Sequence, residues 1–226
     1  MTSYRFSLWQ RRCLHALVGT CFLLCLSHSG FAQTGAVSCK PVSERSGEFG
    51  CWILSHQTLA STVAEPLYWS LDTFPTRAEA EAAKGSNGQV VEALGKVWVF
   101  TISGKDDRPT GGRHVTQIGP LPIKPQTAYM VQYMESVLQP GMSSVIHRHP
   151  GPEAFYTEAG ESCLETPQGK QVGRVGVNVI VPEGEPMTVT ASGTETRRSI
   201  ALVLHDSSHP WSTIAADWKP KGLCRD

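Results

Sequence analysis

The chain has 226 residues, and its 20 basic and 20 acidic residues give a formal net charge of zero. This balance gives no long-range attraction to a phosphate backbone, and no basic stretch is interleaved with aromatic residues, so we expect no nucleic-acid partner. Binding to a membrane surface is disfavoured for the same reason, and the composition does not indicate disorder.

Residues 1–32 have the pattern of a secretory signal peptide. Arg5, Arg11 and Arg12 precede an apolar run from Leu14 to Leu26, and small residues follow near a plausible cleavage point. The run is too short to span a bilayer comfortably. We therefore expect a secreted or periplasmic protein without membrane association once the signal is removed. The remaining 194 residues carry 17 basic and 20 acidic side chains.

Four cysteines lie downstream of this segment, at Cys39, Cys51, Cys163 and Cys224. An even number in an oxidising compartment predicts one or two disulfides, and buried free thiols are the alternative. Three complete pairings are open. Cys39 with Cys51 would close a short loop, and Cys163 or Cys224 could tie down the C-terminal segment.

Residues 33–125 are expected to form a small α/β extension packed on a following domain. Apolar strands are predicted at 52–54, 68–71 and 97–102. A helix is predicted over 77–84, because Thr76 can cap its N-terminus and Gly85 follows its C-terminus. Its acidic residues lie near the N-terminal end and a lysine lies at the C-terminal end, which suits the helix dipole. The polar, glycine-rich segment 105–113 and the proline-rich segment 119–125 are expected to be loops.

Residues 126–206 contain closely spaced β-rich runs separated by glycine and proline, which predict a sandwich or closed barrel. A single mainly β domain is therefore expected there, followed by a tail at 207–226. The runs are 129–138, 143–149, 154–157, 162–166, 178–181, 187–190 and 199–205.

The most informative stretch is 141–160, which holds two histidines and a carboxylate between two glycines. Along a strand, His147 and His149 project to one face and Arg148 to the other. The Pro-Gly-Pro segment at 150–152 reverses the chain, so Glu153 returns opposite the histidines. Two imidazoles and a carboxylate suit iron, manganese, nickel or zinc and leave at least one coordination position free.

The spacing of Gly141, His147, His149, Glu153 and Gly160 resembles the first conserved motif of cupins, with every fixed position met. The resemblance covers roughly residues 126–206. It implies a small cupin-type jelly-roll β-barrel whose interior holds a divalent metal ion. It says nothing about residues 33–125.

The second cupin motif is matched in frame from Gly176 through Pro182 and Gly184, but Met187 replaces its histidine and Ala191 its asparagine. The fourth ligand that the resemblance implies is therefore lost. Either three protein ligands remain, or Met187 ligates a soft ion such as Cu(I). Methionine is also an ordinary core filler, which is the favoured interpretation here.

Other residues are weaker candidates for the site. His205 ends an apolar strand and could replace the missing ligand, but a histidine there is more often exposed. Phe155 should face inward by strand parity, whereas Tyr156 and Glu158 should not. Gln132 and Glu135 have opposite parity, so at most one of the two points into the barrel.

Two function classes follow from the sequence. The first is a metalloenzyme of the dioxygenase, isomerase or decarboxylase type acting on a small oxygenated molecule. The second is a non-enzymatic barrel that binds or senses a small molecule, with a structural metal or none. Fold alone does not decide between them. The expected partner is a small-molecule ligand, and the sequence is compatible with a homodimer.

Overall fold

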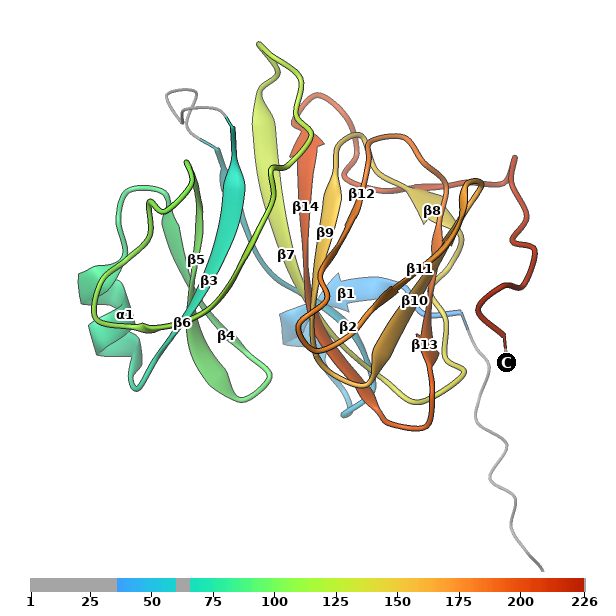
Figure 1. The fold of residues 1–226 in the computed structure, drawn as a ribbon, viewed down its shortest axis with the longest axis horizontal. Helices are drawn as coiled ribbons and strands as arrows, with labels where there is room; N and C mark the ends of the chain where they lie inside the picture. Colours follow the sequence, from blue (N-terminus) through green and yellow to red (C-terminus); the bar gives the residue numbers. More distant parts are fainter. Residues whose placement is uncertain (1–35, 60–65, 226) are drawn as a thin grey trace, which may run out of the picture. The chain divides into compact units, whose positions relative to one another are not determined.

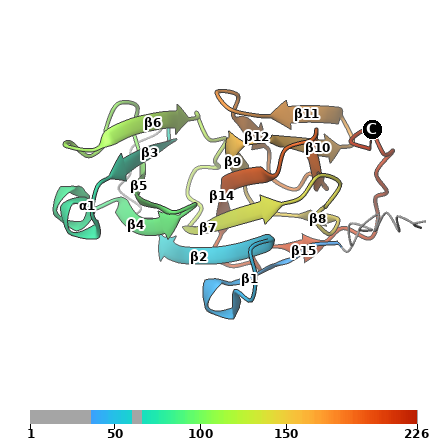
Figure 2. The same cartoon turned by 90° about the horizontal axis from the view of Figure 1, so that it is seen from below.

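The computed structural model describes residues 36–59 and 66–225, so the signal peptide predicted at 1–32 lies outside the described residues. The chain is mainly β, as the sequence predicted. Its largest sheet has six strands in the order β1, β2, β7, β14, β9, β12 (Figures 1 and 2). Their bounds are Cys39–Pro41, Gly50–Thr58, Tyr129–Leu138, Arg197–Asp206, Glu153–Ala159 and Val179–Val181. A short 3₁₀ helix, η1, spans Val42–Glu44.

Two long strands, β7 and β14, form the centre of this sheet and pair antiparallel over ten residues each. Almost every residue of both strands is buried, which means that the sheet is covered on both faces. Successive side chains alternate between the faces, so Met134 and Ala201 join one hydrophobic cluster while Tyr133 and Leu202 join another. The first of these clusters fills the barrel.

Two smaller sheets complete the barrel. The three-stranded sheet has β10 (Glu161–Thr166) between β11 (Gly169–Gly173) and β13 (Thr188–Ser192). The two-stranded sheet pairs β8 (His147–Arg148) with β15 (Thr213–Ile214). Side chains of β13 and β15 line one cavity together with side chains of β7, β9 and β14. The cavity therefore lies between the large sheet and the two smaller ones.

A separate four-stranded antiparallel sheet, in the order β4, β5, β3, β6, comes from the N-terminal half. Its strands span Gly88–Ala93, Lys96–Ser103, Tyr68–Phe74 and Arg113–Ile118. The α-helix α1 runs over Arg77–Ala83. Its first turn is capped as predicted, because the Thr76 hydroxyl accepts a hydrogen bond from the backbone N–H of Glu79 at 3.2 Å.

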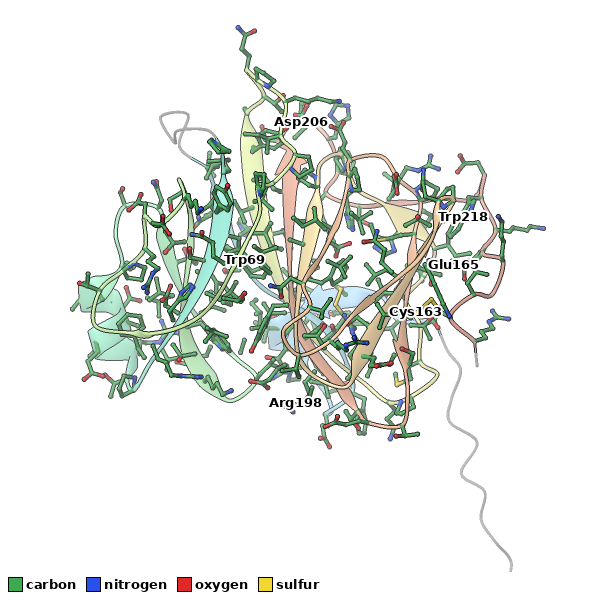
Figure 3. The ribbon with its side chains drawn as sticks, in the orientation of Figure 1. Trp69, Cys163, Glu165, Arg198, Asp206 and Trp218 are labelled. Atoms are coloured by element: carbon green, nitrogen blue, oxygen red, sulfur yellow. A yellow bond between two sulfur atoms is a disulfide. The ribbon has the colours of Figure 1, made fainter. Side chains whose placement is uncertain are left out.

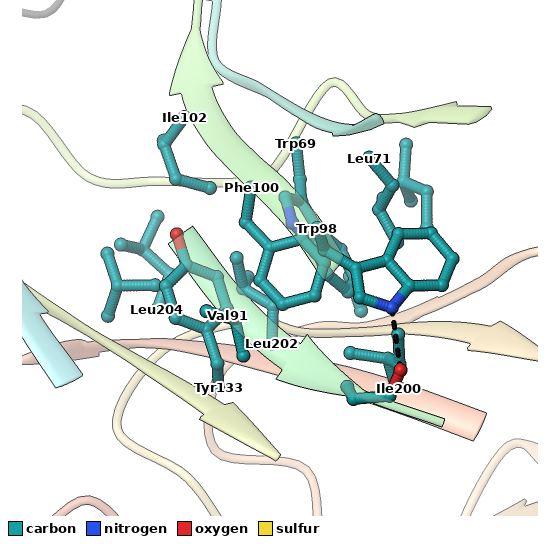
Figure 4. Close-up of a cluster of buried hydrophobic side chains, with 14 of the residues drawn as sticks. Trp69, Leu71, Val91, Trp98, Phe100, Ile102, Tyr133, Ile200, Leu202 and Leu204 are labelled. Carbon is teal, nitrogen blue, oxygen red and sulfur yellow. Dashed lines mark hydrogen bonds between the residues drawn. The ribbon is translucent and has the colours of Figure 1, made fainter. Parts of the chain in front are cut away.

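The four-stranded sheet packs against the outer face of the barrel sheet through large apolar side chains (Figure 4). Phe100 lies at the centre of this cluster, 5.6 Å from the ring of Trp69 and 5.0 Å from that of Tyr133. The indole N–H of Trp98 donates to the carbonyl oxygen of Ala93 at 2.8 Å. Ile200, Leu202 and Leu204 supply the face of β14.

Three expectations for individual segments need correction. The strand expected at 52–54 is part of β2, which pairs with β7 in the barrel sheet rather than with the N-terminal sheet. Its side chains pack on both faces of the barrel sheet, Trp52 in the outer cluster and Ile53 against the cluster inside the barrel. The segment 143–149 is not one continuous strand: only β8 is regular, and Ser143 forms an isolated bridge. Arg113, expected in a loop, begins β6 by pairing with Thr73.

Both pairs of downstream cysteines form disulfides, Cys39 with Cys51 and Cys163 with Cys224. Cys163 lies on β10, beside the C-terminal segment (Figure 3). Glu165, on the same strand, accepts hydrogen bonds from the backbone N–H groups of Lys221, Gly222 and Leu223. Residues 207–225 are thus fixed to the barrel at their far end. Among the described helices, none has the length and apolar character needed to cross a membrane.

Candidate metal centre

The two histidines of the motif are placed by strand β8 and by the chain that faces it. The backbone N–H of His147 donates to the carbonyl oxygen of Met187 at 3.1 Å, and the return bond measures 2.8 Å. The rings of His147 and His149 lie 4.8 Å apart on one face. Arg148 points the other way and makes two hydrogen bonds to the carboxylate of Asp217, at 2.7 and 2.8 Å. The predicted alternation is therefore observed.

The turn at 150–152 docks on the end of β14. The N–H of Asp206 donates to the carbonyl oxygen of Pro150, and the N–H of Leu204 to that of Pro152. A Cβ atom on Gly151 would lie 1.8 Å from the carbonyl oxygen of Leu204, so only glycine fits there. This close approach starts β9 at Glu153, whose side chain enters the barrel beside the histidines.

One ligand-type atom from each of His147, His149 and Glu153 lies within 4.8 Å of the others. Nδ1 of His147 lies 2.8 Å from the carbonyl oxygen of Val145, and Nδ1 of His149 lies 2.6 Å from that of Trp211. A carbonyl oxygen only accepts, so both Nδ1 atoms carry the proton. In the neutral rings, the Nε2 lone pairs are therefore free, as they are in histidines that bind metal ions.

Two polar atoms in this cluster have no hydrogen-bond partner although both are buried. They are Nε2 of His149 and Oε2 of Glu153, which lie 3.3 Å apart. Buried polar atoms are nearly always paired, so two unpaired atoms side by side need an explanation. A cation between the imidazoles and the carboxylate satisfies both atoms. The donor set and its burial therefore fit a divalent metal ion.

The two imidazoles have different electrostatic surroundings. Burial lowers the pKa of His147, and the neighbouring His149 lowers it further. Burial also acts to lower the pKa of His149, but the charge and contact of Glu153 and the bond to Trp211 leave it raised. The carboxylate of Glu153 thus favours positive charge at His149, the position where a metal cation would bind.

Met187 pairs directly across from His147, so both side chains point to the same face of the sheet. The methionine is 1% exposed and packs in the hydrophobic cluster inside the barrel. Among the described residues, it is not one of those that line the cavity. This placement agrees with the interpretation of Met187 as a core filler.

The remaining candidates fall outside the cluster. His205 was expected to be exposed but is buried, because β14 continues through it, and its Nδ1 bonds to the carbonyl oxygen of Asp206. Phe155 lines the cavity as predicted. Tyr156 and Glu158 face outward, where Tyr156 contacts Trp98 and Glu158 pairs with Lys96.

Gln132 and Glu135, the two candidates on β7, point to opposite faces of the strand, as expected from their opposite parity. Glu135 accepts a hydrogen bond from the backbone N–H of Leu94 at 2.9 Å and pairs with Arg45, outside the barrel. Gln132 is buried on the strand's other face, that of Met134, but does not line the cavity. Neither residue belongs to the candidate metal centre.

Several residues of the cavity were not predicted from the sequence, and two of them bear on the site. Trp211, in the segment expected to be a tail, stacks on His149 with ring centres 5.6 Å apart and an angle of 17°. Arg197, the first residue of β14, lines the cavity and is 2% exposed. Burial lowers the pKa of Arg197 to about 10, which still leaves it charged at neutral pH. The cavity itself measures about 210 Å³.

No protein-family model matches the chain, and no curated protein does. Similar solved structures include a cupin-like protein from Thermotoga maritima, at 17% identity and a TM-score of 0.35, covering 41% of this chain and 66% of that one. A DMSP lyase from Ruegeria pomeroyi matches at 18% identity and a TM-score of 0.34, covering 41% and 45%. Oxalate decarboxylase from Bacillus subtilis matches at 21% identity and a TM-score of 0.33, and the match covers 39% of this chain and 24% of that one.

The chain spans less than two thirds of the length of each of these proteins. With TM-scores below 0.5, the matches carry no argument about activity. The sheets, the complete first motif and the cavity carry the structural conclusion. The chain has a cupin-type jelly-roll barrel with a cluster of two histidines and a glutamate in its interior, and a four-stranded sheet with one helix is inserted in the sequence between strands β2 and β7 of the barrel.

Proposed function

We propose that His147, His149 and Glu153 bind one divalent metal ion and that this ion helps to hold a small molecule in the cavity. The observation that carries the proposal is the pair of unsatisfied buried atoms, His149 Nε2 and Glu153 Oε2. Backbone carbonyl groups fix the rings of both histidines and leave the Nε2 lone pairs free. Ligand-type atoms of all three residues lie within 4.8 Å of one another.

When bound, such an ion would supply Lewis-acid polarisation or activation of a coordinated oxygen atom. Iron, manganese, nickel and zinc all suit a set of two imidazoles and one carboxylate. Copper would require Met187 to turn toward the ion. Three protein ligands leave coordination positions free for a small oxygenated molecule, which is the arrangement expected of a dioxygenase, isomerase or decarboxylase.

A non-enzymatic binding or sensing barrel is the second candidate, and the lining of the cavity favours it. Among the described residues, Arg197 is the only titratable side chain that lines the cavity besides the three proposed ligands. Most other lining side chains are apolar or small hydroxyl groups. An enzyme with this site would have no separate side-chain acid or base, so its chemistry would depend on groups bound to the ion.

We also propose that the protein works outside the cytoplasm, in the periplasm or as a secreted protein. The N-terminal signal pattern motivates this, and the two disulfides support it because such bonds persist in oxidising compartments. Fusing residues 1–32 to a reporter that is active only after export would test the signal. A reporter retained in the cytoplasm would contradict the proposal.

Metal loading of a double variant tests the site. His147→Ala with His149→Ala should abolish uptake of zinc or manganese, measured as metal atoms per chain by elemental analysis after dialysis. The matched control is His56→Ala with His209→Ala, two exposed histidines, and it should load like the parent. Circular dichroism would establish that both proteins are folded. Equal uptake by the double variant and the parent would mean that the site is assigned wrongly.

A further inference from the structure

A buried arginine faces the same cavity as the proposed metal ligands. Arg197 comes from the first position of β14, and its side chain turns into the barrel, whereas its neighbour Arg198 lies on the outer face and pairs with Glu158. Burying a guanidinium is costly unless an opposite charge or a full set of hydrogen bonds compensates it. The surroundings of Arg197 therefore indicate what the cavity is built to accept.

The partners of this guanidinium are all neutral. Its Nε donates to the hydroxyl of Ser162 at 2.5 Å, and its Nη1 donates to the hydroxyl of Ser136 at 3.0 Å. A guanidinium has five N–H groups, so three of them have no hydrogen-bond partner within residues 36–59 and 66–225. No carboxylate of these residues forms an ion pair with it within 4.0 Å. Burial lowers the pKa of Arg197, and only the charge of Glu153, which lines the same cavity, counteracts this effect.

The two serines are themselves held by other hydroxyl groups. Ser162 contacts Thr157 at 3.0 Å, and Ser136 contacts Ser199 at 3.2 Å. This arrangement fixes the plane of the guanidinium and leaves Nη2, with both of its N–H groups, without a partner among the described residues. A carboxylate accepts strong, charge-assisted hydrogen bonds from such N–H groups.

The charges in the cavity point to an anion as well. The only lining carboxylate among the described residues is Glu153, and the only other lining charge is that of Arg197. If Glu153 binds a divalent cation between two neutral imidazoles, the enclosed site carries two net positive charges. A small carboxylate would offset this charge in a region where water screens it poorly.

The register of the strands sets the shape of the ligand. Glu153 pairs with Val203 on β14, and Arg197 lies six residues earlier on that strand. At about 3.3 Å per residue, the two backbone positions are separated by most of the length of the barrel, and the long arginine side chain spans part of this distance. Because both residues line one cavity, a ligand can reach from one to the other.

We propose that the cavity binds a small, elongated organic carboxylate, with its carboxylate group paired to Arg197 and its other polar end directed toward His147, His149 and Glu153. The metal-directed half of this inference rests on the proposed function, whereas the pairing with Arg197 does not require the ion. The ligand class is thus a short-chain dicarboxylate or a carboxylate with a second oxygen function at its far end.

Isothermal titration with linear dicarboxylates of increasing length, from oxalate to adipate, tests this inference, and the corresponding diamides serve as neutral controls. Each is titrated into the parent protein with and without bound metal, and the metal content is counted in the same samples. The variants are Arg197→Gln, Arg197→Lys and the matched control Arg198→Gln. Melting temperatures show whether each variant is folded.

We expect at least one dicarboxylate to bind the metal-loaded parent and its diamide to bind much more weakly. Arg197→Gln should lower that affinity about 10- to 150-fold, the range for a charged hydrogen-bonded pair, while metal content stays at the parent's level. Arg197→Lys should retain part of the affinity, and Arg198→Gln all of it. If Arg197→Gln does not fold, the Lys variant provides the comparison, because it keeps the charge and loses the planar fork.

Two results would overturn the inference. One is a metal-loaded parent that binds none of the dicarboxylates, and the other is an unchanged affinity in both Arg197 variants. In either case a parent that still carries one ion per chain would leave the proposed metal site intact. Absence of the ion, with dicarboxylates still bound through Arg197, would instead contradict the metal site alone.

Discussion

The side chains of His147 and His149 are held by backbone carbonyl groups rather than by carboxylates. The carbonyl groups of Val145 and Trp211 accept hydrogen bonds from the Nδ1 atoms and leave each Nε2 atom free, that of His149 lying 3.3 Å from Glu153. A backbone acceptor is present whatever residue occupies its position, so substitution at 145 or 211 preserves it. The side chain of Trp211 adds a second contact by stacking on the ring of His149.

Replacing Trp211 by alanine separates these two contributions. The carbonyl group remains, but the stacked ring that limits motion of His149 is lost, so metal affinity should fall by up to about tenfold, the lower end of the range for groups that orient metal ligands. Titration with zinc would measure the effect. Trp218→Ala, in the same segment and only partly buried, is the control and should bind like the parent. An equal loss in both variants would mean that the indole of residue 211 does not orient the histidine.

Met187→His tests the departure from the second motif. Position 187 pairs directly with His147, so an imidazole there would point to the same face and could add a fourth ligand. We expect tighter binding of nickel, zinc or iron, measured by competition with a chelator. Met142→His, in the loop before β8, should not change the affinity. An unchanged affinity at 187 would show that its side chain does not reach the ion.

The sequence predicted the three proposed ligands because their spacing is local and their chemistry is distinctive. It did not predict Arg197, since Arg197 and Arg198 are adjacent and only the pairing of β14 with β7 and β9 decides which one faces inward. Trp211 was missed for a related reason. Its partner His149 lies 62 positions away, and no local pattern in 207–226 indicates that contact.

At the scale of elements, the C-terminal segment covers the barrel beside the proposed metal ligands. Strand β15 pairs with β8, so Ile214 lies opposite His147. Beyond this point the Cys163–Cys224 disulfide anchors the segment. Three backbone N–H groups of the segment also donate hydrogen bonds to the carboxylate of Glu165. The carboxylate of Glu165 is buried, so it has little competition from water.

Glu165→Gln should loosen this segment. The amide keeps one acceptor oxygen but loses the charge, so the free energy of unfolding should fall by about 1–3 kcal/mol, and proteolysis near the C-terminus should speed up. Urea denaturation and limited proteolysis would measure both effects. Glu48→Gln, at an exposed position, should change neither. Parent-like stability and proteolysis of the Glu165 variant would contradict the proposed anchoring.

Elements with strong local signals were predicted closely. Strand β7 spans Tyr129–Leu138 as expected, because its apolar side chains are buried on both faces. Helix α1 was predicted within one residue, since Thr76 supplies a cap. Strands β6 and β11 were not predicted: both are rich in polar residues, and their formation depends on pairing with β3 and β10. Pairing partners of that kind cannot be found from local composition.

At the scale of the molecule, the barrel sheet is shared by two hydrophobic clusters. One fills the barrel, and the other joins its outer face to the four-stranded sheet (Figure 4). Strands β7 and β14 contribute to both. Disrupting the outer cluster should therefore affect the strands that carry Arg197 and Met134 into the cavity.

Phe100→Ala removes the ring that contacts both Trp69 and Tyr133. We expect a loss of about 3–5 kcal/mol in the free energy of unfolding, because a cavity would remain in a fully buried cluster. Phe100→Leu should cost less. Denaturant unfolding followed by tryptophan fluorescence and by circular dichroism should give a single, coincident transition in the parent. Two separate transitions would mean that the four-stranded sheet and the barrel unfold independently.

The central claim is that one metal ion lies between His147, His149 and Glu153. Crystals of the protein grown with manganese or zinc would test it through anomalous scattering at the absorption edge of the metal. We predict one strong peak per chain, about 2.0–2.2 Å from Nε2 of both histidines and from a carboxylate oxygen of Glu153. A metal-treated crystal with no peak at these three side chains, or with its only peak elsewhere, would contradict the account.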